Sequence, residues 1–296
     1  LVSGGLTLNN ASSKLLLNSI TLDNVTTTSD SLGLDVDNDS TITSFSVAHI
    51  TPVAIASGKS LSGGITVSAG SLKLSEAGTL ASSVLMSGGT LDADDSLAVS
   101  GALSHTADIT INVADNKTLT YSGAPISLGA NTVTLSGGGS LVSGGLTLNN
   151  ASSKLLLNSI TVDNVSTTVN NSLGVDVDND STITSFSVAN ITPVAIASGS
   201  SLSGGITLSA GSIKLAETGT LASSISMSGG TLDADNSLTV SGALTHSDNI
   251  TIDVADTKTL TYSGTAISLG ANTLTLTGGG SLVSGGLTLN DPSSKL

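Results

Sequence analysis

Hydrophobic and polar residues alternate along this chain in short runs, such as LTL at 6–8 and TVTL at 132–135. Paired glycines precede several of these runs, as at 4–5, 63–64 and 88–89. A strand places successive side chains on opposite faces, and glycine allows the positive φ that a tight corner requires. The pattern therefore predicts short β-strands separated by corners, each strand with one aliphatic face and one hydroxyl-rich face.

The whole pattern also repeats with a long period. Residues 1–140 return, largely unchanged, as residues 141–281, and residues 282–296 begin a third copy. A module duplicated this closely is typical of repeat architectures that stack identical units. We therefore divide the chain into one solenoid repeat at 1–140, a second at 141–281 and the start of a third at 282–296, with no linkers between them.

Each long repeat divides into about seven coils of roughly 20 residues. In the first copy these begin at Leu1, Thr21, Thr41, Leu61, Leu80, Leu97 and Leu119. Units of this length predict an all-β fold, a parallel β-solenoid (β-helix) whose strands pair from coil to coil. At about 4.8 Å per strand, one repeat would advance roughly 33 Å and the chain about 70 Å, as a continuous rod. The alternative is a series of tandem β-sandwich domains, which the missing Trp and the finer period disfavour.

Differences between the copies indicate which positions are buried. Five exchanges keep an aliphatic side chain of similar size and are expected in the core: Leu22 to Val162, Leu34 to Val175, Val67 to Leu208, Leu72 to Ile213 and Val133 to Leu274. The one change of length, residues 29–30 against 169–171, predicts a surface loop. Pro292 replaces Ala11 and Ala151 and predicts a corner, whereas Leu85 against Ser226 predicts an outward position.

Composition excludes several classes of function. The net charge is −14, all eight cationic residues are Lys, and Phe and Tyr together number four with no Trp. Binding of nucleic acid needs phosphate neutralisation and usually aromatic platforms, so this class is disfavoured. Without Cys there is no disulfide or thiolate metal site, and no apolar run is long enough to predict a membrane span.

One acidic pattern suggests a metal site. Carboxylates alternate in LDVDNDS at 34–40 and again in VDVDNDS at 175–181. The candidate ligands are Asp35, Asp37 and Asp39, with Asp176, Asp178 and Asp180 in the second copy. Oxygen ligands at this spacing suit Ca²⁺, although the EF-hand pattern fails at Ser40 and Ser46. The alternative is plain alternation, with Leu34 and Val36 inside and the Asp side chains solvated or capping a turn.

Other constellations could support catalysis, and we weigh each against a structural role. Asp92 and Asp94 resemble paired glycosidase carboxylates, but no Arg or aromatic subsite accompanies them, and they recur as Asp233 and Asp235. His105, recurring as His246, lies beside a hydroxyl residue without the sequence context of a nucleophile elbow. Thr-x-Thr runs are compatible with an ice-binding surface but occur in only some coils. We expect the chain not to be an enzyme.

The Gly-, Asn-, Ser- and Thr-rich coils, for example 127–148, resemble the repetitive β-helical segments of filamentous-haemagglutinin-like adhesins and autotransporter passengers. The resemblance lies in composition and rhythm and implies a cell-surface or extracellular setting. It fits a structural protein, an interior segment of a long solenoid that forms a filament, stalk or surface layer. The alternative is the shaft of an adhesin that binds a host or surface ligand, and a polysaccharide-active β-helix is a further one.

The two ends of the sequence bear on assembly. Both ends have the sequence of an ordinary repeat, whereas the end coils of a solenoid normally have an atypical capping sequence. We therefore expect the chain to continue or the molecules to associate end to end. The acidic surface further predicts lateral association through Ca²⁺, and contact with a cell surface or a polysaccharide is a further expectation.

Overall fold

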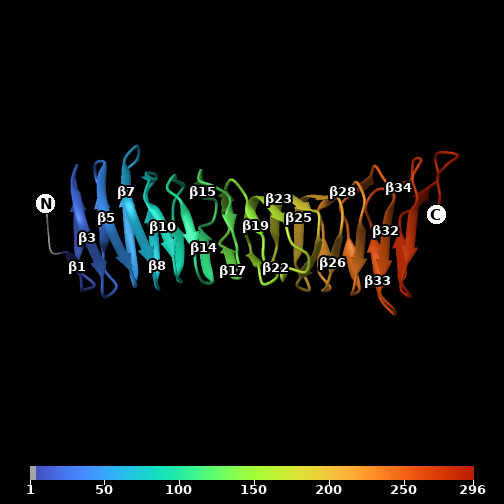
Figure 1. Cartoon of the computed structure of the whole chain (residues 1–296), viewed down its shortest axis with the longest axis horizontal. Helices are drawn as coiled ribbons and strands as arrows, with labels where there is room; N and C mark the ends of the chain where they lie inside the picture. Colours follow the sequence, from blue (N-terminus) through green and yellow to red (C-terminus); the bar gives the residue numbers. More distant parts are fainter. Residues whose placement is uncertain (1–4) are drawn as a thin grey trace. The chain divides into compact units, whose positions relative to one another are not determined.

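The computed structural model describes residues 5–296, and none of these residues is helical. The chain forms two compact units: residues 5–127 with 131–145, and Leu128–Ala130 with Leu146–Leu296. In both units the strands pair in parallel with the strands of the next coil (Figure 1). The predicted parallel β-solenoid is therefore confirmed, and the sandwich alternative is wrong because a sandwich is built from antiparallel sheets.

Unit 1 has two sheets, to which each coil contributes in turn. The first sheet contains β1 (Leu6–Leu8), β3 (Thr21–Thr27), β5 (Ser40–Val47), β7 (Ser60–Val67), β9 (Thr79–Leu80), β10 (Ser83–Met86), β12 (Leu97–Val99), β13 (Leu103–His105), β15 (Thr118–Tyr121), β16 (Ile126–Ser127) and β18 (Ser140–Val142). The second contains β2 (Lys14–Leu17), β4 (Gly33–Val36), β6 (Ile50–Ile55), β8 (Ser71–Ser75), β11 (Thr90–Ala93), β14 (Ile109–Val113) and β17 (Thr132–Ser136). These seven strands mark the seven coils predicted for a repeat. The expected starting residue of the first coil, Leu1, lies outside the described residues.

Unit 2 repeats this arrangement. Its first sheet contains β19 (Leu146–Leu148), β21 (Thr161–Thr167), β23 (Ser181–Val188), β25 (Ser201–Leu208), β27 (Thr220–Leu221), β28 (Ser224–Met227), β30 (Leu238–Val240), β31 (Leu244–His246), β33 (Thr259–Tyr262) and β36 (Ser281–Ser284). Its second contains β20 (Lys154–Asn158), β22 (Gly174–Asn179), β24 (Ile191–Ile196), β26 (Ser212–Leu215), β29 (Thr231–Ala234), β32 (Ile250–Val254) and β35 (Leu274–Thr277). A short pair, β34 (Ile267–Ser268) with β37 (Leu287–Thr288), completes the unit.

The core of each unit is a set of aliphatic columns that run from coil to coil. One column of unit 1 joins residues in register on β4, β6, β8, β11 and β14, all of them buried: Leu34, Val53, Leu74, Ala93 and Val113. A column of this kind puts apolar side chains at every strand spacing of about 4.8 Å. Hydrophobic burial along such columns therefore holds successive coils together.

Close approach of the coils also requires glycine at one bend. Strand β5 carries a bulge between Ile42 and Phe45. Strand β7 pairs with β5 at this bulge, where Gly63 lies in register with Ile42 and has a φ of +114°. A Cβ atom at Gly63 would lie 1.9 Å from the main-chain oxygen of Ile42. Farther along the stack the strand divides at this bend into β9 and β10. Glycines 63–64 therefore lie inside β7 and not at a corner before a strand as predicted, and Gly63 is needed for the bend and for the close approach of the coils.

The exchanges between copies fall where the sequence predicts. All ten residues of the five aliphatic exchanges are buried. The length change lies in the loop that joins β3 to β4 and β21 to β22, and Ala11, Ala151 and Pro292 all lie in turns. Leu85 faces outward and is 40% exposed, as its replacement by Ser226 predicts.

The four aromatic residues all contribute to the cores. Phe45 and Phe186 are among the largest fully buried side chains. Tyr121 and Tyr262 are buried too, and their hydroxyls accept the main-chain N–H groups of Leu103 and Leu244 at 3.1 and 3.0 Å. The outer surfaces of the two units therefore offer no aromatic platform for a sugar ring.

Candidate functional site

The candidate metal ligands of unit 1 have three different environments. Asp35 projects outward from β4, and its carboxylate forms an ion pair of 2.7 Å with Lys14 Nζ. Asp37 follows the end of β4 and is exposed. Asp39 lies at the next corner, where its Oδ1 accepts hydrogen bonds from the main-chain N–H and the hydroxyl of Ser60 at 2.8 and 3.1 Å. Each of the two partnered carboxylates thus contacts a neighbouring coil.

Unit 2 places the second set of candidates in the same way. Asp176 pairs with Lys154 at 2.7 Å, Asp178 is exposed, and Asp180 accepts from the main-chain N–H and hydroxyl of Ser201 at 2.8 and 2.9 Å. Within residues 5–296, no group of three or more Asp, Glu or His side chains is arranged to hold a metal ion. The structure therefore does not bring either Asp triplet together around one point.

Side-chain oxygens at the corners link each coil to the next. Asp30 Oδ1 accepts the N–H of a residue 20 positions later at 3.0 Å, and Asn170 occupies this place in unit 2 with a bond of 2.9 Å. Asp108 and Asn249 form a second matched pair, each accepting the N–H of a residue 24 positions later at 2.7 Å. Unit 1 has Asp and unit 2 has Asn at each of these two positions. Both copies therefore keep a side-chain oxygen that accepts the hydrogen bond, and the negative charge is dispensable.

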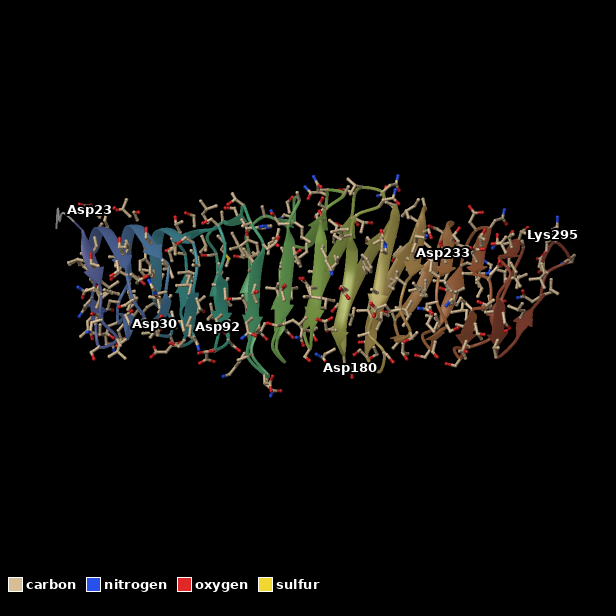
Figure 2. All side chains as sticks on the ribbon, turned by 90° about the horizontal axis from the view of Figure 1, so that it is seen from below. Asp23, Asp30, Asp92, Asp180, Asp233 and Lys295 are labelled. Atoms are coloured by element: carbon tan, nitrogen blue, oxygen red, sulfur yellow. The ribbon has the colours of Figure 1, made fainter. Side chains whose placement is uncertain are left out.

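Lysine side chains lie between the paired carboxylates on the outer face. Lys73 Nζ contacts Asp92 at 3.3 Å and Asp94 at 3.1 Å. The hydrogen bond to Asp94, followed by the charge of Asp92, raises the pKa of Lys73. Lys214 likewise lies 3.5 and 3.3 Å from the corresponding carboxylates, Asp233 and Asp235. Asp92 and Asp233 are visible on the outsides of their units in Figure 2.

The two recurrent histidines contact the main chain. Nδ1 of His105 lies 3.1 Å from the carbonyl oxygen of Ala107, and Nε2 lies 3.0 Å from that of Ser127. Nδ1 of His246 similarly lies 3.1 Å from the carbonyl oxygen of Asp248. These contacts fix both rings against turns, an arrangement that suits a structural role better than proton transfer to a hydroxyl nucleophile.

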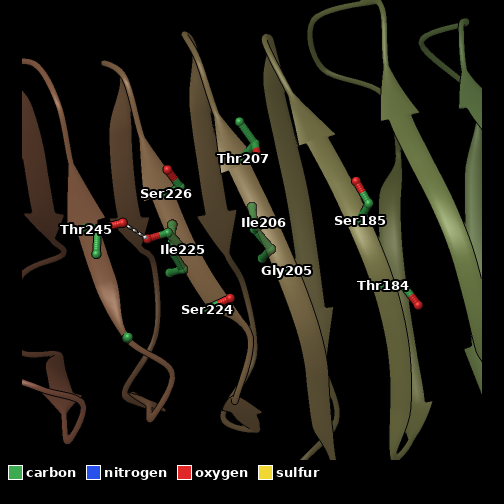
Figure 3. A pocket seen from close by; sticks show the side chains of 10 residues that line it. Thr184, Ser185, Gly205, Ile206, Thr207, Ser224, Ile225, Ser226 and Thr245 are labelled. Carbon is green, nitrogen blue, oxygen red and sulfur yellow. Dashed lines mark hydrogen bonds between the residues drawn. The ribbon is translucent and has the colours of Figure 1, made fainter.

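A shallow groove lies on the outer face of the first sheet in unit 2 (Figure 3). Its volume is about 270 Å³, and its lining residues come from β23, β25, β28, β31 and the turn just before β31. Thr207, Ser226 and Thr245 form one row in register along its length, and Gly205 lies in register with Ser224. Hydroxyl groups thus recur once per coil along the groove, with no charged side chain in its lining.

Unit 1 has the matching groove, in which three corresponding residues differ: Val84 for Ile225, Leu85 for Ser226 and Ser104 for Thr245. It is lined by Ser44, Gly64, Thr66, Ser83 and Ser104 among others, and its volume is about 210 Å³. Leu85 occupies the place of Ser226 and interrupts the hydroxyl row. The exchange of Leu85 for Ser226 predicted an outward position, but the groove itself was not predictable, since the coil register that aligns its lining is set only in the folded chain.

Comparison with known proteins adds no family to this picture. No family description, curated protein or solved structure matches the chain. The residues described above and their contacts are therefore the basis for any functional proposal. Among residues 5–296, the structure also has no helix able to span a membrane.

Proposed function

We propose that the chain is a structural segment of an extracellular filament, stalk or surface layer, and that its work is mechanical. The observation that carries the proposal is the use of polar side chains to join coils. The oxygens of Asp39, Asp30 and Asp108 accept N–H groups of the following coil, and their counterparts in unit 2 do the same. A side-chain bond at a corner adds to the aliphatic columns and the main-chain ladder, so separation of two coils breaks three kinds of contact at once.

Electron microscopy and fibre diffraction of the concentrated, purified chain test this proposal. We expect filaments or bundles whose diffraction shows a reflection at about 4.8 Å along the fibre axis, because the strand spacing of a solenoid lies along its stack. Chains that stay monomeric at every concentration, with and without Ca²⁺, would contradict a role in assembly.

Lateral association through Ca²⁺ is part of the same proposal. A net charge of −14 makes copies of the chain repel one another, and a divalent cation shared between exposed carboxylates would reduce that repulsion. Asp37 and Asp178 are exposed, as are Asp39 and Asp180, but the latter two already accept hydrogen bonds from Ser60 and Ser201. We expect bundles to thicken with Ca²⁺ and to thin with a chelator. Replacement of Asp37 and Asp178 by Asn should reduce the calcium effect, while equal thickening by Na⁺ at matched ionic strength would indicate simple screening.

The hydroxyl groove supports a second candidate function, the shaft of an adhesin. A groove with hydroxyl donors and acceptors and no charge suits a neutral polyhydroxylated chain such as a glycan. Binding to a panel of immobilised neutral glycans tests it. Ser226→Leu should abolish binding by unit 2, and Leu85→Ser should add binding by unit 1. Binding that neither substitution changes would place the ligand elsewhere.

A further inference from the structure

A column of charged and polar side chains runs across the outer face of the second sheet in unit 2. Lys214, Asp233, Asp253 and Thr277 lie in register on β26, β29, β32 and β35. Neighbouring parallel strands are about 4.8 Å apart, so the side chains of Asp233 and Asp253 project side by side. Two like charges in this relation destabilise the pairing of their strands.

Unit 1 has an amide at the position of one of these carboxylates. Lys73, Asp92, Asn112 and Ser136 occupy the corresponding column. Asn112 Nδ2 donates a hydrogen bond to Asp92 Oδ1 at 2.8 Å, and its Oδ1 accepts from Ser136 Oγ at 3.0 Å. The amide therefore joins three successive coils through one side chain.

Asp253 keeps only one of these two bonds. Its Oδ1 accepts a hydrogen bond from Thr277 Oγ1, as Asn112 accepts from Ser136. An ionised carboxylate has no hydrogen to donate, so the bond toward the preceding coil is lost, and Asp253 instead lies in register with the like-charged Asp233. Protonation of Asp233 would restore a donor at this place.

The surroundings of Asp233 leave the negative charge only partly compensated. Its side chain is 15% exposed and faces Lys214 on β26, Asp253 on β32 and Asp235 in the turn after β29. Burial and the charge of Asp235 raise the pKa of Asp233, with a smaller contribution from Asp253 and an opposing one from Lys214. The nearby Lys258 contacts the uncharged Asn236 at 3.3 Å, whereas its counterpart in unit 1 pairs with Asp95.

We propose that Asp233 and Asp253 form a proton-sensitive contact between coils of unit 2, weak at neutral pH and strengthened when one proton is shared between the two carboxyl groups. The direction of the pH dependence follows from the linkage between proton binding and folding. A carboxyl group whose pKa is raised by folding binds more protons in the folded state, so stability rises as the pH falls through that raised pKa. Mild acid would thus give unit 2 the bond that Asn112 makes in unit 1 at every pH.

Hydrogen exchange of the full chain, measured by mass spectrometry and corrected for the intrinsic rate at each pH, tests the proposal. Peptides that cover β29 and β32 should gain protection by about twofold to fivefold between pH 7 and pH 5, the size of a cross-strand pair interaction. The corresponding peptides of β11 and β14 are the internal control and should not gain it.

Two reciprocal variants decide the cause. Asp253→Asn should give β29 and β32 higher protection at pH 7 and reduce the dependence on pH, while burial and Asp235 still act on Asp233. Asn112→Asp should create the same dependence in β11 and β14 of unit 1. A dependence on pH that survives Asp253→Asn unchanged, or its absence in the wild-type chain, would overturn the proposal.

Carbon NMR can follow the titration of Asp233 directly. Its midpoint reports the interaction with Asp253 and would not change through a difference in stability alone. With Asp residues labelled at the carboxyl carbon, the midpoint of Asp233 should fall in the Asp253→Asn variant. An unchanged midpoint would show that the two groups do not interact and would equally overturn the proposal.

Discussion

Substitutions between the two repeats keep different properties at core positions, at corners and on the open outer face. Inside, Val67 becomes Leu208 and both are fully buried, so volume and apolar character are kept. At a corner, Asp108 becomes Asn249, and the bond to the next coil keeps its length of 2.7 Å while the charge is lost. On the open face, Leu85 becomes Ser226 and neither property is kept. Constraint thus decreases from the core to the corner acceptors and then to the open face.

The largest expected difference in stability is between substitutions at two adjacent residues of β10, Met86 and Leu85. Met86 is fully buried, so Met86→Ala should cost about 2–5 kcal/mol through lost burial and the cavity left behind. Leu85→Ser should change stability by no more than about 0.5 kcal/mol, since Leu85 faces outward. Urea unfolding of both variants measures the difference. Equal losses would show that the two faces of β10 are not distinguished as the structure indicates.

A second test concerns the close approach of coils at the bend. Gly204 has φ +110°, and a Cβ there would lie 1.9 Å from the main-chain oxygen of Ile183. Gly204→Ala should therefore cost about 2 kcal/mol or more, because the backbone of one coil must move. Gly199 is a matched control with φ +85° and no atom near the added Cβ. Gly199→Ala should cost about 1 kcal/mol from backbone strain alone.

Thermal unfolding and urea midpoints of the two glycine variants provide the comparison. A loss for Gly199→Ala as large as that for Gly204→Ala would mean that the positive φ, and not contact between coils, limits both positions.

A third, smaller effect tests the corner acceptors. Asp108→Asn should leave stability unchanged within about 0.5 kcal/mol, because Asn249 makes the same bond in unit 2. Asp108→Ala removes the acceptor of the Thr132 N–H and should cost about 1 kcal/mol. Hydrogen exchange at β17 should reveal the loss locally. If Asn destabilises as much as Ala, the carboxylate charge itself is needed and the role assigned to this corner is wrong.

Much of the fold was predictable because alternation reports directly on which side chains are buried. Leu34 and Val36 lie inside and Asp35 outside, as alternation on a strand requires. The coil length and the number of coils per repeat were likewise accessible from the spacing of the repeated pattern. These features depend on local sequence and on the period, both of which are visible without the folded chain.

The partners between coils were not predictable in the same way. Asn112 and Asp92 are 20 residues apart, Asp39 and Ser60 are 21 apart, and Asp108 and Thr132 are 24 apart. Corners of varying length set these separations, so period alone does not say which polar side chains meet. The need for Gly63 depends in addition on a bulge in the neighbouring coil, which the sequence of β7 does not reveal.

The smallest expected effect compares the lysines of the two outer faces. Exposed ion pairs typically contribute about 0–1 kcal/mol, so Lys73→Met should change stability little. Lys214→Met should cost more, since Lys214 stands beside Asp233 and Asp235 while Asp253 adds a third carboxylate to the column. The pKa of Lys214 is raised, first by the charge of Asp233. Its contribution is therefore complete at neutral pH and is lost as the pH rises through that raised value.

Unfolding at low salt and at 1 M salt separates charge from packing in these two variants. At 1 M the screening length is about 3 Å, so the difference between Lys73→Met and Lys214→Met should largely disappear if it arises from charge. A difference that persists in high salt would instead assign it to packing of the lysine stem against the sheet. The excess negative charge of the unit 2 column would then have no measurable consequence at neutral pH, and the contrast between Asn112 and Asp253 would be one of hydrogen bonding alone.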